Sequence, residues 1–424
     1  NVAIGRGPLA ANTTGTQNVA IGAYALTAND DSHYNVAIGR EALKTSDGGA
    51  SNVAIGRTAL MLLTTGDNNV AIGANAGDAI NTGSSNVLMG LNAGGALTDN
   101  SGNVCIGNQP FRTANSGENY NVVIGGDAGA SIDDGGSDYN VIIGQDAGTG
   151  GAAAMAKCVA VGGNAMNSTA ANTQTGTIAI GYDALTALTS GAANVAIGYR
   201  AASATTNSAG NVAIGYDALR LCSVSDGHNV AIGHGVMNGG TGGYYNICIG
   251  KDTGAAFADA NVGTCVLIGH EAGDAINHSD ANSTIAIGYS ALGALTSGAG
   301  NVAIGYEALL QHTTGSRNTA IGHQAMRDTG GEPTSTDNVM IGYQAGAGDW
   351  TTATSNYNVC VGNYVMDAAL DGANSNTGVG YGALGDLEEG DSNVCVGSAA
   401  GALIINGDSN VCIGKDAGNT ITSG

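Results

Sequence analysis

Apolar and polar positions alternate in a pentapeptide, Asn-Val-Ala-Ile-Gly in its commonest form, that recurs along the whole chain. Its second position is Val or Ile, with Thr319 and Thr377 as exceptions, and its fourth is Ile, Val or Met. Such a period of two predicts a β-strand. The 24 copies begin at residues 1, 18, 35, 52, 69, 86, 103, 121, 140, 158, 177, 194, 211, 229, 246, 265, 284, 301, 318, 338, 358, 376, 393 and 410.

The spacing between copies predicts how the chain folds around each strand. Copies lie 17 residues apart at first and later 17 to 20, and a second short apolar segment and a loop of Thr, Ser, Asn, Asp and Gly follow each pentapeptide. A strand, a glycine corner, a second segment and a polar turn make up one coil of a β-solenoid. We therefore expect an all-β, parallel β-solenoid of about 24 coils, forming a single repeat array over residues 1–424 without a linker.

Two positions of the pentapeptide are nearly invariant. Position five is always Gly, which indicates a positive φ angle at a corner or close approach of another backbone segment. Position one is Asn except at Cys158, Thr177, Cys265 and Thr284, and predicts a ladder of stacked, buried amides. The alternative is an Asn-lined stripe that binds sugars. The structural residues are exemplified by two copies, Asn18, Val19, Ala20, Ile21 and Gly22, and Asn211, Val212, Ala213, Ile214 and Gly215.

Position three suggests that one chain is not enough. It lies on the opposite side of the strand from positions two and four, so in a lone solenoid it should face water. Yet it is never charged or hydroxylated, being usually Ala and otherwise Leu, Cys, Val, Ile, Met or Gly. We expect an identical chain to cover position three, because a straight stripe of small residues can pack on its own copies. A loop folding back over the strand is the alternative.

The motif Asn-Val-Ala-Ile-Gly-x-x-Ala, as in residues 18–25, 211–218 and 301–308, resembles the head repeat of YadA-like trimeric autotransporter adhesins. A similar repeat occurs in the tail and surface fibres of bacteriophages and other viruses. The resemblance covers the whole chain. It implies a left-handed parallel β-roll, a homotrimer or higher fibre assembly, and attachment of an extracellular fibre to a surface. The chain is then expected to be a segment of a longer fibre, on a cell or a virion.

Composition and charge exclude several classes of protein. With 12 basic and 34 acidic residues the formal net charge is −22, which would repel a polyanion and excludes a nucleic-acid binder. A hydrophobic content of 43% argues against disorder, and the chain contains no apolar run long enough to span a membrane. The 72 glycines do not recur at every third position, which excludes collagen. Excess negative charge suits a fibre that must stay unaggregated in salty water.

Aromatic and sulfur-containing residues follow the same repeat. Five of the eight cysteines replace the position-three residue and should behave as small buried hydrophobes; Cys395 and Cys412 occupy that place in adjacent coils, where a disulfide is conceivable. A partial stripe of tyrosines follows the position-five glycine. It would either pack against the adjacent coil or stack on glycan rings of a cell surface. Its members are Tyr182, Tyr199, Tyr216, Tyr289, Tyr306, Tyr343 and Tyr381.

No residue pattern points to catalysis or to a firm metal site. His234, His270 and His323 share one position of the repeat but lie in non-adjacent coils, which argues against a metal cluster, and no cofactor is assigned. The best calcium candidate is the acidic loop with Asp133, Asp134 and Asp138. We predict a non-enzymatic structural or adhesive fibre, with a phage or viral tail fibre as the alternative. A polysaccharide-cleaving solenoid enzyme needs acids gathered in one groove, and an ice-binding protein needs a Thr ladder in every coil; neither pattern is present.

Overall fold

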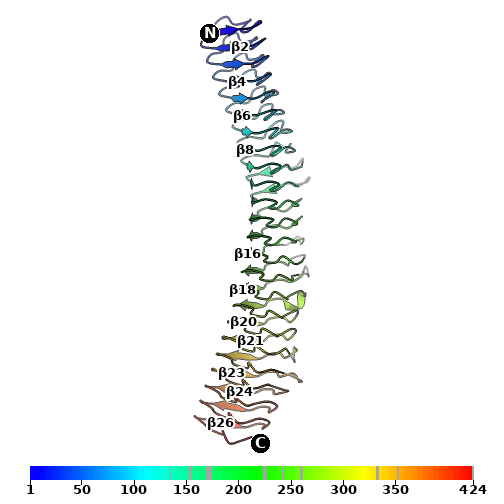
Figure 1. The fold of residues 1–424 in the computed structure, drawn as a ribbon, viewed down its shortest axis with the longest axis vertical. Coiled ribbons are helices and arrows are strands. Elements are labelled where there is room, and N and C mark those ends of the chain that lie inside the picture. Colours follow the sequence, from blue (N-terminus) through cyan, green and yellow to red (C-terminus); the bar gives the residue numbers. More distant parts are fainter. Residues whose placement is uncertain are drawn as a thin grey trace. The chain divides into compact units, whose positions relative to one another are not determined.

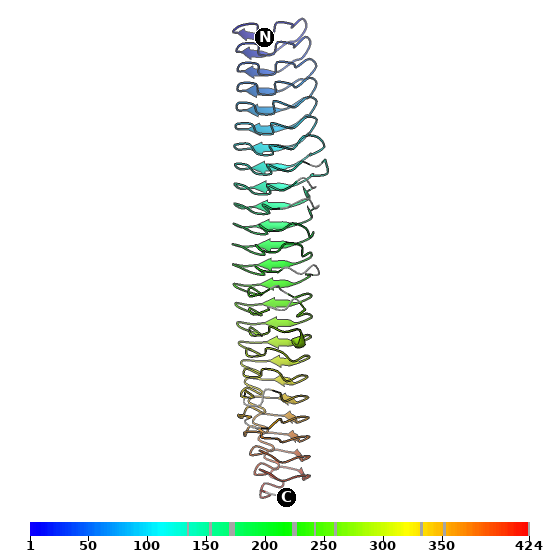
Figure 2. The same cartoon turned by 90° about the vertical axis from the view of Figure 1, so that its right-hand side faces the viewer.

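The computed structural model describes residues 1–133, 135–151, 155–168, 174–222, 227–240, 243–257, 261–330, 334–350 and 353–422. The chain forms two compact units, Asn1–Gly210 and Asn211–Gly424. In each unit short parallel strands succeed one another like the rungs of a ladder, with loops closing each coil beside them (Figures 1 and 2). The predicted parallel β-solenoid is confirmed, with about 23 coils. That residues 1–424 form a single array stays a prediction, because the chain divides into two units.

Among its described residues, the first unit contains twelve strands of three residues, each made of positions two to four of a pentapeptide. Two short strands, β10 (Met155–Ala156) and β12 (Gln174–Thr175), pair with each other outside this series. The twelve are β1 (Val2–Ile4), β2 (Val19–Ile21), β3 (Val36–Ile38), β4 (Val53–Ile55), β5 (Val70–Ile72), β6 (Val87–Met89), β7 (Val104–Ile106), β8 (Val122–Ile124), β9 (Val141–Ile143), β11 (Val159–Val161), β13 (Ile178–Ile180) and β14 (Val195–Ile197).

The second unit repeats this arrangement and adds one turn of 3₁₀ helix, η1 (Ser279–Ala281). Its strands are β15 (Val212–Ile214), β16 (Val230–Ile232), β17 (Ile247–Ile249), β18 (Val266–Ile268), β19 (Ile285–Ile287), β20 (Val302–Ile304), β21 (Thr319–Ile321), β22 (Val339–Ile341), β23 (Val359–Val361), β24 (Thr377–Val379), β25 (Val394–Val396) and β26 (Val411–Ile413).

Equivalent positions of successive copies pair directly. Val19 is opposite Val36, Ala20 opposite Ala37, and Ile21 opposite Ile38, and the same register holds for the other paired strands of each unit. Each position of the repeat therefore forms a ladder along its unit, which is the property that turns a sequence period into a continuous surface.

The structure contradicts the expected direction of position three. In nearly every coil the position-three side chain is fully buried by its own chain, whereas positions two and four are only partly covered. The core lies between position three and the Ala and Leu positions after the glycine, as with Ala20, Ala25 and Leu26, all fully buried. The chain itself keeps the position-three stripe away from water, and no sister chain is needed for this.

Side-chain sizes inside a coil show why position three belongs to the core. Where position three is large, the residue four past the position-five glycine is itself glycine. A Cβ placed on Gly94 would lie 3.0 Å from a methyl group of Leu88, and one on Gly148 would lie 3.1 Å from Ile142. The coil is too narrow for two large side chains, and close-packed interiors penalise any excess volume.

The position-one asparagines form the predicted buried ladder. The backbone N–H of Asn35 donates to Oδ1 of Asn18 at 2.9 Å, and the Asn35 side-chain amide donates to the carbonyl of Gly49 at 2.8 Å. Apart from Asn1 and Asn410 in the two end coils, these asparagines have almost no exposed surface, so they are not a sugar-binding stripe. The ladder satisfies backbone groups that each coil leaves unpaired beside its strand.

All eight cysteines are buried thiols, and no disulfide joins Cys395 and Cys412. The expectation that Cys105, Cys248, Cys360, Cys395 and Cys412 act as small hydrophobes is confirmed by their position in the core. Burial, together with the neighbouring Cys412 thiol, raises the pKa of Cys395 to about 12, which keeps that thiol protonated at neutral pH.

One histidine of the second unit, His312, is fully buried. Burial lowers the pKa of His312 to about 4, against an ordinary 6.5. Its Nε2 accepts from the Asn318 amide at 3.1 Å, and its Nδ1 lies 3.2 Å from Oγ1 of Thr329. Because Nε2 faces an N–H donor, protonation there would set two donors against each other.

We therefore expect the free energy of unfolding to fall by about 3 kcal/mol as the pH drops from about 6.5 to about 4. In this range His312 is protonated in the unfolded chain but stays neutral where it is buried in the folded one. Denaturant unfolding at pH 7 and pH 4.5, followed by hydrogen exchange around Leu309, measures this loss. H312Q should remove most of it, and the exposed-site variant H278Q should retain it. Equal pH dependence in H312Q and the native chain would contradict the assignment.

Candidate functional site

The surface of the strands is the most extensive feature that faces outward. Positions two and four form two ladders of Val, Ile and Met side chains, with Thr at residues 319 and 377, and we call this surface the outer strand face. These side chains are partly exposed, and no charged residue interrupts either ladder. Away from the first and last coils, exposure on this face reaches 38% at Met89 and 39% at Ile247. A continuous apolar surface of this kind marks an interaction site far more often than a surface left free in water.

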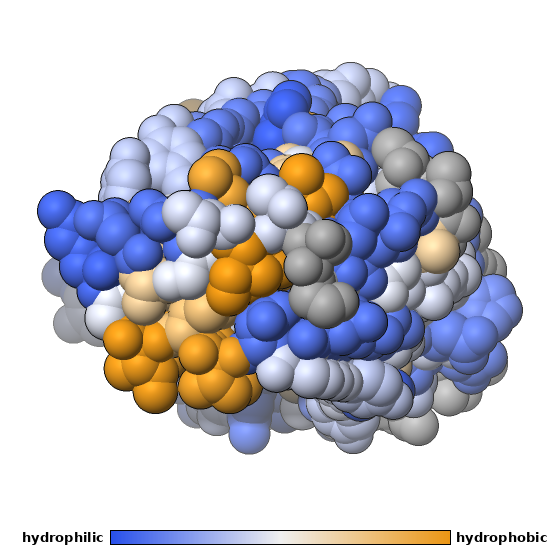
Figure 3. Space-filling view, turned by 90° about the horizontal axis from the view of Figure 1, so that it is seen from below, coloured by the Kyte–Doolittle hydropathy of each residue, from blue (hydrophilic) through white to orange (hydrophobic). Residues whose placement is uncertain are grey.

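The end view of the second unit shows the same partition. Hydrophobic side chains gather in the middle of the end coil and at one edge, and hydrophilic side chains surround them (Figure 3). In this last strand Val411 and Ile413 are 70% and 71% exposed, while Cys412 between them is buried. The alternation confirms which side of the strand points outward.

The tyrosine stripe runs beside the strands as a ladder of stacked rings. Tyr182 stacks on Tyr199 with ring centroids 5.8 Å apart, and Tyr289 stacks on Tyr306 at 5.2 Å. The prediction that these tyrosines pack against the adjacent coil is confirmed for such pairs. All seven rings remain partly exposed, from 39% at Tyr343 to 61% at Tyr381, so contact with glycans stays a prediction.

The predicted histidine positions are rungs of the same ladder. His234 stacks on Tyr216 at 5.0 Å, His270 on Tyr289 at 5.4 Å, and His323 on Tyr306 at 4.9 Å. Parallel rings at this spacing stabilise neighbouring coils by about 0.5–1.5 kcal/mol a pair beyond the area they bury. As expected from their spacing, the three histidines lie in non-adjacent coils and do not meet one another.

One tyrosine of the stripe has an open ring face. Beneath Tyr182 the preceding coil carries Gly163, so that no side chain fills that rung, and a hollow of about 290 Å³ remains. Its other lining residues are Gln145, Asp146 and Asn164. An aromatic face bordered by amides and a carboxylate is suited to a ring with one apolar face and polar edges, such as a pyranose.

The calcium candidate is described only in part. Asp134 lies outside the described residues, and Asp133 is exposed. Asp138 is committed to the backbone, because its Oδ1 accepts from the N–H of Asn119 at 2.6 Å. Calcium binding by Asp133, Asp134 and Asp138 therefore stays a prediction, with one of its three carboxylates already engaged.

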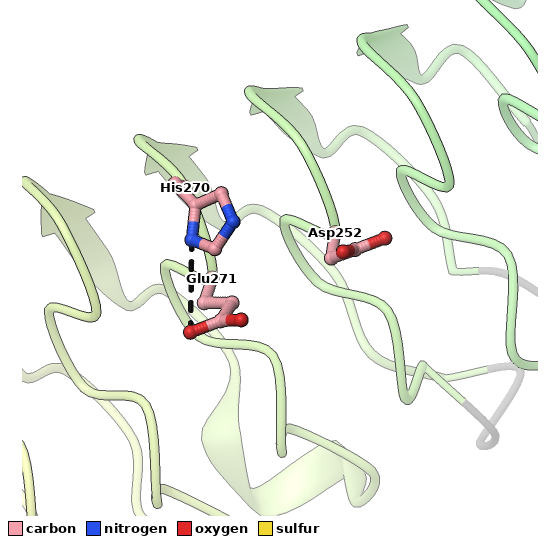
Figure 4. Close-up of side chains that lie close together, drawn as sticks. All are labelled: Asp252, His270 and Glu271. Atoms are coloured by element: carbon pink, nitrogen blue, oxygen red, sulfur yellow. Dashed lines mark ion pairs between the residues drawn. The ribbon is translucent and has the colours of Figure 1, made fainter.

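A different cluster brings together possible metal ligands that the sequence pattern did not reveal. Asp252, His270 and Glu271 come from two successive coils of the second unit, and their ligand atoms lie within 4.8 Å of one another (Figure 4). It is the one such group found among the described residues. Only the stacking of coils, which places residue 252 beside residues 270 and 271, could have indicated it.

The fold and these surfaces define a parallel β-solenoid repeat protein with an apolar outer strand face and an aromatic ladder. Comparison of the sequence with family models and with curated proteins gave no match. Nor does the described part of the chain include a helix with the length and apolar character needed to cross a bilayer.

Proposed function

We propose that the chain is a non-enzymatic structural or adhesive fibre that acts outside the cell and assembles from copies of itself through the outer strand face. The observation that carries the proposal is the double ladder of Val, Ile and Met on that face, which no charged residue breaks and in which Thr replaces Val or Ile only at Thr319 and Thr377. A second copy of the same solenoid presents the same spacing of rungs, so two or three copies can match each other coil by coil.

The energetics of such a match favour assembly. Burying one further methyl-sized group contributes about 0.8 kcal/mol. If each of the 24 strands buries one such group, the chain gains roughly 20 kcal/mol before the entropic cost of association. The net charge of −22 opposes it at low ionic strength, since like-charged chains repel one another. We therefore expect assembly to strengthen as salt is added.

The resemblance to the head repeats of YadA-like trimeric adhesins supports three copies and a role in surface attachment. Repeats of viral tail fibres support the same architecture with a different owner, and a host-recognition fibre remains the alternative function. In either case the exposed edges of the tyrosine ladder and the open face of Tyr182 are the places where a surface glycan would make contact.

The test is the mass of the native particle. Light scattering after size-exclusion chromatography in about 0.15 M salt should give about three times the chain mass of 41.3 kDa. The double variant I55K/I72K places two charges on the outer strand face of adjacent coils and should shift the particle to the monomer, because an interface core tolerates unpaired charge poorly.

A matched control separates loss of the interface from added charge. Thr65 and Thr82 lie on exposed loops of the same two coils, so T65K/T82K adds the same charge away from the outer strand face and should keep the native mass. Circular dichroism checks that both variants remain folded. A native chain that runs as a 41.3 kDa monomer at all protein and salt concentrations tested would overturn the proposal.

A further inference from the structure

A group of titratable side chains in the second unit, unused by the fibre proposal, has the composition of a metal site. Asp252 follows β17, and His270 and Glu271 follow β18, at the corner where each strand turns outward. We infer that Asp252, His270 and Glu271 bind a divalent first-row transition-metal ion, for which Zn²⁺ is the probe. Imidazole and carboxylate together suit Zn²⁺, whereas Ca²⁺ and Mg²⁺ prefer oxygen ligands alone.

The state of the His270 ring is the observation that singles out this cluster. Its Nδ1 is shielded from solvent and has no hydrogen-bond partner, although the ring as a whole is partly exposed. A shielded nitrogen without a partner is costly, since it has lost water and gained nothing in return. Figure 4 shows this nitrogen directed at the Glu271 carboxylate.

The distances fit an ion better than a hydrogen bond. His270 Nδ1 and Glu271 Oε2 are 3.6 Å apart, which is too long for a hydrogen bond. Two ligands bound to one tetrahedral Zn²⁺ at about 2.0–2.1 Å would lie about 3.3 Å apart. The His270–Glu271 distance of 3.6 Å is therefore close to that spacing, and a ligand atom of Asp252 lies within 4.8 Å of one from each of the other two residues.

The surroundings of the cluster supply further negative charge. Burial, followed by repulsion from Glu271 and Asp252, raises the pKa of the neighbouring Asp274. His234, one coil before Asp252, has its Nδ1 3.9 Å from Asp252 Oδ1 but does not belong to the cluster. A bound cation would relieve the repulsion among the three carboxylates.

Lys251 is the competing cation. Its ammonium group lies 2.6 Å from Oδ2 of Asp252, leaving Oδ1 free. The lysine side chain is 53% exposed, so it can swing into water when a metal arrives. Replacing Lys251 by an uncharged residue should therefore strengthen metal binding. If the Lys251–Asp252 ion pair only stabilised the fold, this replacement would not increase the affinity for metal.

The experiment is calorimetric titration of the purified full chain with Zn²⁺, supported by the visible absorption of Co²⁺ as a readout of imidazole and carboxylate ligation. We expect one site per chain that survives an excess of Ca²⁺ or Mg²⁺. H270Q and E271Q should each weaken binding at least tenfold, and K251Q should strengthen it severalfold.

The matched control is H323Q, which removes a histidine from the same rung position of a distant coil where the described residues hold no such cluster. It should leave the Zn²⁺ affinity unchanged. Binding that H270Q and E271Q leave intact would overturn the proposal, as would the absence of saturable Zn²⁺ binding by the native chain. Neither result depends on the oligomeric state, so the fibre proposal is tested separately.

Discussion

Replacing Gly125 by alanine should destabilise the first unit by about 4 kcal/mol, whereas the same change at the next residue, Gly126, should have little effect. Gly125 is the position-five glycine after β8, with φ at +143°, and a Cβ there would lie 2.3 Å from the carbonyl oxygen of Gly144 in the next coil. The strained backbone and the clash with a fixed backbone atom each cost about 1–3 kcal/mol.

Gly126 is the matched control because a Cβ at this position would meet nothing within 4 Å. Denaturant unfolding of both variants measures the difference, and hydrogen exchange should show the greatest loss of protection in β8 and β9. Local loss is expected because each coil of a solenoid is stabilised mainly by its neighbours. If G125A proved as stable as G126A, close approach of successive corners could not be the reason for the invariant glycine.

The second large effect is expected at the asparagine ladder. Asn358 donates from its side-chain amide to the carbonyl of Ala373 at 2.8 Å, and its Oδ1 accepts from the backbone N–H of Asn376 at 3.0 Å. The variant N358A would leave both of these backbone groups buried without their partner. At about 1–3 kcal/mol for each, we expect a loss of about 4 kcal/mol in the free energy of unfolding.

The chain contains its own reference for this position. Cys158 and Cys265 occupy the same place in other coils, where each thiol donates to a carbonyl of the following loop, at 3.6 Å to Gln174 and 3.5 Å to Ala281. N358C should therefore lose less stability than N358A, since it keeps a weak donor for Ala373. Chemical denaturation ranks the three proteins, and an N358A variant as stable as the native chain would show that water replaces the ladder.

Much of the fold follows directly from the sequence because equivalent residues of successive coils lie against each other. The period set the strands, the glycine corner and the amide ladder, and all three are found where predicted. The strands themselves are shorter than the pentapeptide, since Asn at position one is occupied by the ladder and Gly at position five turns the chain away.

The functional surfaces were harder to predict from the sequence than the fold. Asp252 lies eighteen residues before His270, and nothing in their local sequences links them. Their proximity depends on the length of the intervening loop and on which side of the corner each side chain leaves the coil. The open face of Tyr182 likewise depends on a glycine in another coil, Gly163, being the rung directly beneath it.

Sequence by itself determined the repeating unit, its parallel stacking and the residues that recur for backbone reasons. Only the tertiary structure decided which side of each strand faces the core. Both sides are apolar, so the sequence pattern does not indicate which of them points inward. The contacts across the coil show the direction: Leu88 lies against Gly94 and Met340 against Gly346, so position three points inward. The interior of the coil is too narrow for a β-branched side chain from every strand position, so Val and Ile at positions two and four lie on the outside.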